Sequence, residues 1–540
     1  MKRRNFITNT ALAAIGITSV LATSCNTKSD TPKSENNDAS TEDDFELNEI
    51  TISELQAKME SGKYSSEQIT KLYLDRIEAI DKNGPKLNAI IEINPEALNI
   101  AKAMDTERKE GKIRGNLHGI PILIKDNIDT ADKMMTTAGS LALLGSIASN
   151  DAFIVKKLRD AGAVLLGKTN LSEWANFRST SSCSGWSSRG GQTKNPYVLD
   201  HSPCGSSAGS GVAVAANLCV VAVGTETDGS IVCPASVNGT VGIKPTVGLL
   251  SRSGIIPISH TQDTAGPLAR TVTDAVMLLE TMIGVDDADI VTKESVGKST
   301  GKYTQYLKAD GLKGKIIGIE KKKYTNPLLN ELLEKATNMM KQQGATIVEI
   351  EYLDKINANG DSEFEVMQYE FKYGVNKYLA TANSKMKSLE DVIAFNKKNE
   401  AKAMPTFKQE TLEMCQEKAG LESAAYVKAL TKSHTDVKKM IDAVMKENNL
   451  DAISGLTMGP ACSIDIIYGD RWGDVFLTAP AAMSGYPHIS IPCGKVYELP
   501  VGLSFFSGAY QEGEIISLAY GYEQASKNRI KPEFKKAFLD

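Results

Sequence analysis

Two short segments of the sequence carry serines in settings that suit nucleophilic catalysis. The first, "PCGSSAGSG", includes the run "GSSAG" at residues 205–209, which fits the G-x-S-x-G pattern around the nucleophile of many hydrolases. The second, "GTETDGSIVCPA", places Ser230 in a turn between an apolar run and Pro234, with no histidine nearby. A serine hydroxyl is a weak nucleophile until a base takes its proton, so the chain must also supply a base.

One candidate base is a histidine, with Ser207 as the nucleophile of a Ser-His-Asp esterase of the α/β-hydrolase type. That fold needs a core strand directly before the first glycine, but the preceding "KNPYVLDHSP" has the composition of a loop. Of the later histidines, His488 lies in the apolar run "YPHISIP", which is more typical of a buried strand residue. This hydrolase is therefore the alternative interpretation.

A more specific constellation combines Lys125 in "GIPILIKDN" with Ser206 and Ser230. These segments, in this order and with the two serines 24 positions apart, resemble the amidase signature family. Further matching stretches are "GKTNLSEWA" at 167–175, "GIKPTVG" at 242–248 and "QDTAGPLART" at 262–271. The resemblance extends over roughly the whole of residues 50–530.

The resemblance implies a Ser-cisSer-Lys triad that hydrolyses a carboxamide through an acyl-serine. Ser230 would be the nucleophile, Ser206 a bridging serine on a cis peptide bond, and Lys125 the base. A lysine acts as a base only when neutral, and its ordinary pKa is about 10.4. The apolar run "IPILIK" offers the burial that can lower this pKa toward neutrality. Neither a metal nor a cofactor is expected.

The turn that leads to the nucleophile is expected to stabilise the negative charge that develops during acyl transfer. The resemblance implies that the backbone N–H groups of Thr227, Asp228, Gly229 and Ser230 form this oxyanion hole. Such donors typically contribute about 100-fold to 1000-fold each to the rate.

Three residues depart from the commonest family pattern, "GTDTGGSIRxPA": Glu226, Asp228 and Val232 stand in place of Asp, Gly and Arg. This variant is similar to the peptide amidase branch, which removes the C-terminal amide of peptides. Because Val232 replaces a guanidinium that would bind a substrate carboxylate, neutral amides are the expected substrates. Asp228 and Ser207 are further candidate substrate contacts. Asp228 is expected either to accept hydrogen bonds from substrate N–H groups or to face a structural partner.

These residues must be positioned by helices and strands, and the alternation of apolar runs with helical segments predicts a single large α/β/α domain over residues 50–540 with a central mixed sheet. Possible capping boxes at Thr51 and Ser65 begin two amphipathic helices. Residues 360–447 are rich in charge and predict a helical insertion. Two shorter helices are predicted near 152–161 and 208–217. Strands are predicted at the apolar runs "GIPILIKDN", "AVLLGKTN", "LCVVAVGT", "KIIGIE", "TIVEIE", "HISIPCG" and "VGLSFFSG".

The N-terminus has a different character from the rest of the chain. Its basic start, the apolar stretch 11–22 and the small residues before Cys25 are typical of a secretory signal. The arginines at 3–4 resemble a twin-arginine pattern, and the residues before Cys25 resemble a bacterial lipobox. We expect a signal peptide over 1–24, lipidation of Cys25, and a disordered polar tether over 25–49. We therefore expect the protein to be exported and lipid-anchored to a bacterial membrane, either in the periplasm or at the cell surface.

Composition limits the partners of the chain. The net charge of −5 comes from well-mixed acids and bases, so no nucleic-acid partner is expected. The expected partner is a small amide or peptide substrate, with membrane contact only through the lipid. Besides Cys25 there are seven cysteines without metal-binding spacing, although one disulfide within 183–233 stays possible. A catalytically inactive lipoprotein that binds peptides is a further alternative function.

Overall fold

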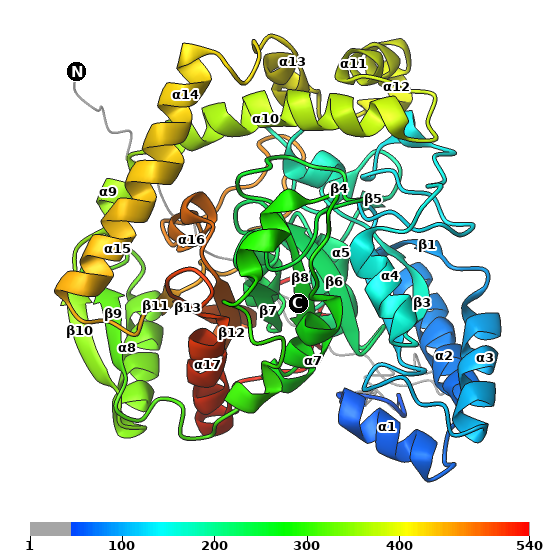
Figure 1. Cartoon of the computed structure of the whole chain (residues 1–540), viewed down its shortest axis with the longest axis horizontal. Coiled ribbons are helices and arrows are strands. Elements are labelled where there is room, and N and C mark those ends of the chain that lie inside the picture. The colour runs from blue at the N-terminus through cyan, green and yellow to red at the C-terminus, as the bar shows by residue number, and fades with distance from the viewer. Residues whose placement is uncertain (1–44, 539–540) are drawn as a thin grey trace, which may run out of the picture. The chain divides into compact units, whose positions relative to one another are not determined.

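The structure, a computed structural model, describes residues 45–538 (Figure 1). The predicted signal peptide, Cys25 and most of the predicted tether lie outside the described residues. The end of the tether needs a correction, because Leu47 is fully buried and the Phe45 ring lies 5.8 Å from that of Tyr73. The folded domain thus includes residues 45–49. Apolar side chains at 45 and 47, which the polar composition around them concealed, pack into the core.

Eleven strands of the described chain form one mixed sheet in the order β1-β3-β2-β6-β8-β7-β12-β13-β11-β9-β10. The β2 strand pairs in parallel with β3 and β6, and β9 pairs in parallel with β10 and β11, while the other neighbours are antiparallel. The strands are β1 (Ile90–Ile93), β2 (Pro121–Lys125), β3 (Val164–Thr169), β6 (Val221–Glu226), β7 (Val241–Lys244), β8 (Thr264–Ala269), β9 (Ile316–Glu320), β10 (Thr346–Ile350), β11 (Ala452–Leu456), β12 (His488–Val496) and β13 (Leu499–Phe506); β4 (Trp186–Ser187) and β5 (Gly191–Gln192) form a separate pair.

The central strands are covered on both faces. Every residue of β2, β3, β6 and β8 is buried, and successive side chains of a strand point to opposite faces. Both faces must therefore be packed against other elements, which explains why these strands are continuous apolar runs without alternation. This arrangement confirms the predicted α/β domain with a central mixed sheet.

The helices begin largely where the sequence predicts. Thr51 and Ser65 form complete capping boxes with Glu54 and Gln68. The α-helices are α1 (Ile52–Glu60), α2 (Ser66–Arg76), α3 (Ala97–Lys109), α4 (Phe153–Asp160), α5 (Ala208–Ala215), α6 (Val232–Val237), α7 (Val272–Met282), α8 (Pro327–Gln342), α9 (Leu353–Asn357), α10 (Gly360–Thr381), α11 (Leu389–Lys398), α12 (Glu400–Ala403), α13 (Glu410–Gln416), α14 (Ala424–Leu430), α15 (Val437–Glu447), α16 (Ala479–Ser484) and α17 (Glu512–Ser526).

The predicted insertion over 360–447 is helical throughout most of its length, from α10 to α15. Figure 1 shows α10 running across the top of the view, with α14 and α15 descending at the left. The insertion is packed onto the rest of the domain, because Phe371 and Val375 of α10 share a buried apolar cluster with Trp174, Phe177 and Ile256. The α10 helix therefore lies next to the loops that carry 174–177 and 256–258.

The disulfide that the sequence leaves open within 183–233 is not formed in the described chain. Its seven cysteines are all free thiols, and six of them are buried. Within residues 45–538 no helix combines the length and the apolar character that crossing a membrane requires.

Candidate functional site

Lys125 ends β2 and is fully buried between the neighbouring strand and the Ser206 loop. Its Nζ donates hydrogen bonds to Ser206 Oγ at 2.7 Å, to Thr225 Oγ1 at 2.8 Å and to the Thr225 carbonyl oxygen at 3.1 Å. Thr225 belongs to β6, the parallel neighbour of β2. The sheet therefore fixes the lysine so that its amine faces Ser206.

Burial lowers the pKa of Lys125 far enough for the side chain to act as a base near neutral pH. Removal from water disfavours the ammonium form and lowers the pKa of Lys125 to about 7. The carboxyl groups of Asp263 and Glu226 oppose this change, because their negative charge favours the ammonium form. At neutral pH the lysine is divided between its neutral and charged forms, which suits proton transfer in both directions.

The two catalytic serines predicted from the sequence lie on adjoining main-chain segments. The peptide bond between Gly205 and Ser206 is cis, and Ser206 is fully buried. The N–H group of Ser207 donates to the carbonyl oxygen of Ser230 at 3.2 Å. Within residues 45–538 the Ser230 hydroxyl has no hydrogen-bond partner. The structure thus joins Lys125 directly to Ser206, and it brings Ser230 beside the Ser206 loop through the main chain.

The turn over residues 227–230 presents unpaired backbone donors. Glu226, the last residue of β6, accepts hydrogen bonds from the N–H groups of Ile231 at 2.7 Å and Val232 at 2.9 Å. These bonds hold the chain on the far side of the turn, and Gly229 supplies a φ of +75° within it. In the described part of the chain, no acceptor pairs with the N–H groups of residues 227–230. Four donors next to Ser230 are therefore free to bind an oxyanion.

Ser207 and His488 do not form the arrangement that the alternative hydrolase requires. Ser207 is fully buried; its Oγ donates to the carbonyl oxygen of Thr225 at 3.0 Å and accepts from the Thr225 N–H at 3.2 Å. The Nε2 atom of His488 lies 2.6 Å from Ser504 Oγ, and burial lowers the pKa of this histidine to about 3. Ser207 thus serves to attach its loop to β6 and exposes no surface to a substrate.

The two other predicted substrate contacts have different surroundings. Val232 is fully buried at the start of α6, so its side chain faces the core. Asp228 is partly exposed, and its Oδ1 atom is buried without a hydrogen-bond partner among the described residues. Glu363 of α10 lies near Asp228 and accepts a hydrogen bond from Gln262 Nε2 at 2.7 Å. Burial and the charge of Asp228 raise the pKa of Glu363 well above its usual range.

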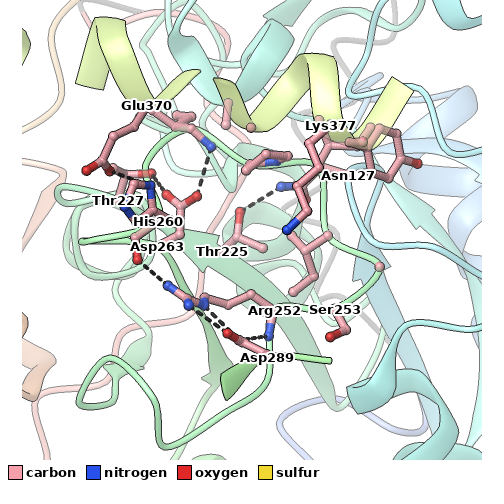
Figure 2. Close-up of a pocket in the computed structure, with 18 of the residues that line it drawn as sticks. Asn127, Thr225, Thr227, Arg252, Ser253, His260, Asp263, Asp289, Glu370 and Lys377 are labelled. Carbon is pink, nitrogen blue, oxygen red and sulfur yellow. Dashed lines mark hydrogen bonds and ion pairs between the residues drawn. The ribbon is translucent and has the colours of Figure 1, made fainter. Parts of the chain in front are cut away.

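A cavity of about 470 Å³ adjoins these groups (Figure 2). Thr225, which binds Lys125, and Thr227, the first residue of the oxyanion turn, both line it. Most of its other lining residues come from the loop 252–260, from residues 288–289 and from α10, and the rest are Asn127, Ala175, Asp263 and Thr264. The cavity therefore opens beside both Lys125 and the turn over residues 227–230.

Several residues of the site were not singled out from the sequence. Thr225 lies in the same "GTETDGS" segment as Ser230, and Asp263 lies in the matching stretch "QDTAGPLART", so both were within reach of motif reasoning. Asn127 follows Lys125 by two positions and donates from Nδ2 to Thr225 Oγ1 at 3.0 Å. Glu363 carries no local signal, because only the packing of α10 brings it to the site.

The chain is similar over most of its length to known amidases. The family model described as Amidase matches residues 68–516. A probable amidase of Arabidopsis thaliana is 42% identical over 505 residues, which cover 91% of this chain and 92% of the relative. The crystal structure of native peptide amidase from Stenotrophomonas maltophilia is 47% identical with a TM-score of 0.85, and the match covers 91% of this chain and 99% of that one.

A more distant relative shares the same extent. A putative amidase of Schizosaccharomyces pombe is 38% identical over 522 residues, which cover 90% of this chain and 87% of the relative. The residues matched by the family model include every strand of the sheet and the helical insertion, and the predicted resemblance is confirmed. The chain belongs to the amidase signature family of amide-hydrolysing enzymes.

Proposed function

We propose that this enzyme hydrolyses the C-terminal carboxamide of peptides, or a closely related neutral amide, and releases ammonia through an acyl-serine intermediate. The observation that carries the proposal is the 2.7 Å hydrogen bond from Lys125 Nζ to Ser206 Oγ, next to the main chain of Ser230. A buried lysine with a pKa of about 7 in contact with a serine relay suits the activation of a second serine.

The proposed reaction begins with two linked proton transfers. Neutral Lys125 takes the proton of the Ser206 hydroxyl, and Ser206 takes the proton of the Ser230 hydroxyl. The Ser230 oxygen then bonds to the carbonyl carbon, and the N–H groups of residues 227–230 stabilise the resulting oxyanion.

Collapse of this intermediate breaks the carbon–nitrogen bond. The departing nitrogen takes its proton back through Ser206 from the Lys125 ammonium, so ammonia leaves and the acyl group stays on Ser230. Water then adds to the acyl-serine with the same groups acting as base and acid, and the product is a carboxylic acid.

The proposed preference for neutral amides is supported by two arginines, Arg178 and Arg189, that are already paired with carboxylates of the protein. Arg178 is buried with its Nε 3.3 Å from Glu173, and Arg189 is paired with Glu92 and Asp126. Neither guanidinium is free to pair with a carboxylate next to the scissile carbonyl. A carboxylate placed there would lose hydration without gaining a partner, and it would also face Asp228.

The likeness to the peptide amidase of Stenotrophomonas maltophilia supports the choice of peptide amides, because the two chains share 47% of their residues over nearly their whole length. We also propose that the mature enzyme is exported and anchored through lipid on Cys25, as its N-terminal sequence indicates.

Ammonia release from an N-acetylated dipeptide amide tests the proposal. We expect turnover by the wild-type enzyme and a loss of kcat of about 1000-fold or more in each of Lys125→Ala, Ser206→Ala and Ser230→Ala. Malonamate, which carries a carboxylate beside the amide, should be a much poorer substrate. No ammonia from any peptide amide would favour the inactive peptide-binding lipoprotein, and preference for malonamate would remove the assignment to peptide amides.

A further inference from the structure

Among the described residues, one charged side chain that lines the cavity beside Lys125 has no partner. Six acidic or basic side chains line it: Arg252, His260, Asp263, Asp289, Glu370 and Lys377. The exposed side chain of Lys377, on α10, makes no ion pair or hydrogen bond with the described chain. In Figure 2 this side chain extends from α10 into the cavity.

The other five groups are already satisfied by the protein. Arg252 binds both carboxylate oxygens of Asp289, at 2.8 Å from Nε and 2.7 Å from Nη2. The His260 Nδ1 atom lies 3.4 Å from the Glu370 carboxylate. Asp263 accepts hydrogen bonds from Thr227 Oγ1 and from two main-chain N–H groups. Among the described residues that line the cavity, Lys377 is therefore the one positively charged side chain without an ion-pair or hydrogen-bond partner.

A second unpaired group lies deeper in the same cavity. Asn127 is only 1% exposed, and its Nδ2 donates to Thr225 Oγ1, which also accepts from Lys125. Its Oδ1 atom is buried and has no partner among the described residues. A buried amide oxygen without a donor is costly, so a ligand that brings an N–H group would stabilise the site.

The remaining lining favours an extended, partly apolar ligand. The segment 255–258, "IIPI", forms one wall, and Tyr373 and Tyr378 of α10 contribute aromatic surface to the cavity. A volume of about 470 Å³ is in the range of small-molecule and short-peptide sites. A peptide combines apolar carbons, N–H donors and, in acidic residues, a carboxylate.

We propose that this cavity binds the peptide part of the substrate, that Asn127 Oδ1 accepts one of its N–H groups, and that Lys377 selects an acidic side chain. The inference rests on the proposed hydrolysis of peptide amides and narrows their class. The carboxylate in question is on a side chain that reaches Lys377. It differs from a carboxylate next to the scissile carbonyl, which we expect to be unfavourable.

Paired N-acetyl dipeptide amides that differ only in Glu or Gln, at either of the two positions, test this selection. The wild-type enzyme should favour Glu over Gln in kcat/KM by about threefold to tenfold at one position, as expected for a partly hydrated ion pair. Lys377→Met should bring this ratio to about one, and Lys377→Glu should reverse it. The matched control is Lys385→Met, which removes an exposed positive charge beyond the end of α10 and should keep the wild-type ratio.

The same peptides separate a failure of this inference from a failure of the proposed function. If both peptides are hydrolysed and the Glu-to-Gln ratio of kcat/KM is the same in the wild-type enzyme and in Lys377→Met, the role of Lys377 is overturned. Amide hydrolysis itself would still stand. If neither peptide is cleaved, calorimetric titration of Ser230→Ala with the Glu and Gln peptides still measures the selection without turnover. Equal affinities for the two peptides in that titration would overturn the inference.

Discussion

The pH dependence of turnover follows from the environment of Lys125. With a pKa of about 7, the lysine is about 50% neutral at pH 7, about 1% at pH 5 and about 99% at pH 9. A lysine with the ordinary pKa of about 10.4 would be only about 0.04% neutral at pH 7. Burial in β2 therefore supplies about 1000-fold more neutral base at neutral pH.

This difference sets the shape of the expected profile. Because the neutral form is the base, kcat/KM should rise about tenfold per pH unit below pH 7 and level off above it. The assay is ammonia release from an uncharged N-acetyl dipeptide amide between pH 4.5 and 9.5, so that the substrate itself does not titrate. Lys125→Arg, which keeps a positive charge at every pH, should be inactive throughout.

The carboxyl groups near Lys125 provide a test of whether the pKa of this lysine sets the pH profile. Asp263 and Glu226 favour the ammonium form of Lys125, so Asp263→Asn should move the rising limb to lower pH. Burial raises the pKa of Asp263 to about 6, so its own titration adds curvature at the acid end of the wild-type profile, which the Asn variant should lose. A profile that is flat between pH 5 and 9, or one with a midpoint above pH 9, would refute the assignment of Lys125 as the neutral base.

Two further predictions concern the oxyanion turn and the N-terminus. Gly229→Ala should lower kcat by about 100-fold, because Gly229 has a φ of +75° and an added Cβ would lie 2.8 Å from Cys233 Sγ, which would displace the free N–H groups; unchanged kcat would show that these groups are not the oxyanion hole. Cys25→Ser should release a soluble and still active enzyme from the membrane fraction, because the proposed catalytic groups all lie in the domain over 45–538; continued membrane association would contradict a lipid anchor.

The sequence predicts the central part of the fold because its strands are buried on both faces. β2, β3 and β6 are continuous apolar runs that end at Lys125, Thr169 and Glu226, and each run is visible without any knowledge of its neighbours. β8 was missed, because "TAGPLA" contains a glycine and a proline that normally disfavour a strand. β7 was missed because it has only four residues, and β11 because its sequence "AISGL" includes an alanine and a glycine, which have low strand propensity.

In the candidate site, some residues are recognisable from the local sequence and others reach the site only through tertiary packing. Lys125, Ser206 and Ser230 occur in recognisable segments, and the structure places all three in one region. Val232 is a predicted substrate contact because it occupies the position of an arginine in the commonest family pattern, but the start of α6 turns its side chain into the core. Lys377 comes to its cavity only because α10 folds over the loop 252–260, a contact between residues more than a hundred positions apart.

The identity of the reactive serine distinguishes the proposed Lys125–Ser206–Ser230 mechanism from a Ser-His-Asp hydrolase. A fluorophosphonate reacts with an activated serine and leaves a stable adduct, which peptide mass spectrometry locates to a single residue. We expect labelling at Ser230, lost in Ser230→Ala and strongly reduced in Lys125→Ala. Labelling at Ser207 that persists in Ser230→Ala would contradict the proposed mechanism, because the nucleophile would then lie in the G-x-S-x-G run of an α/β-hydrolase.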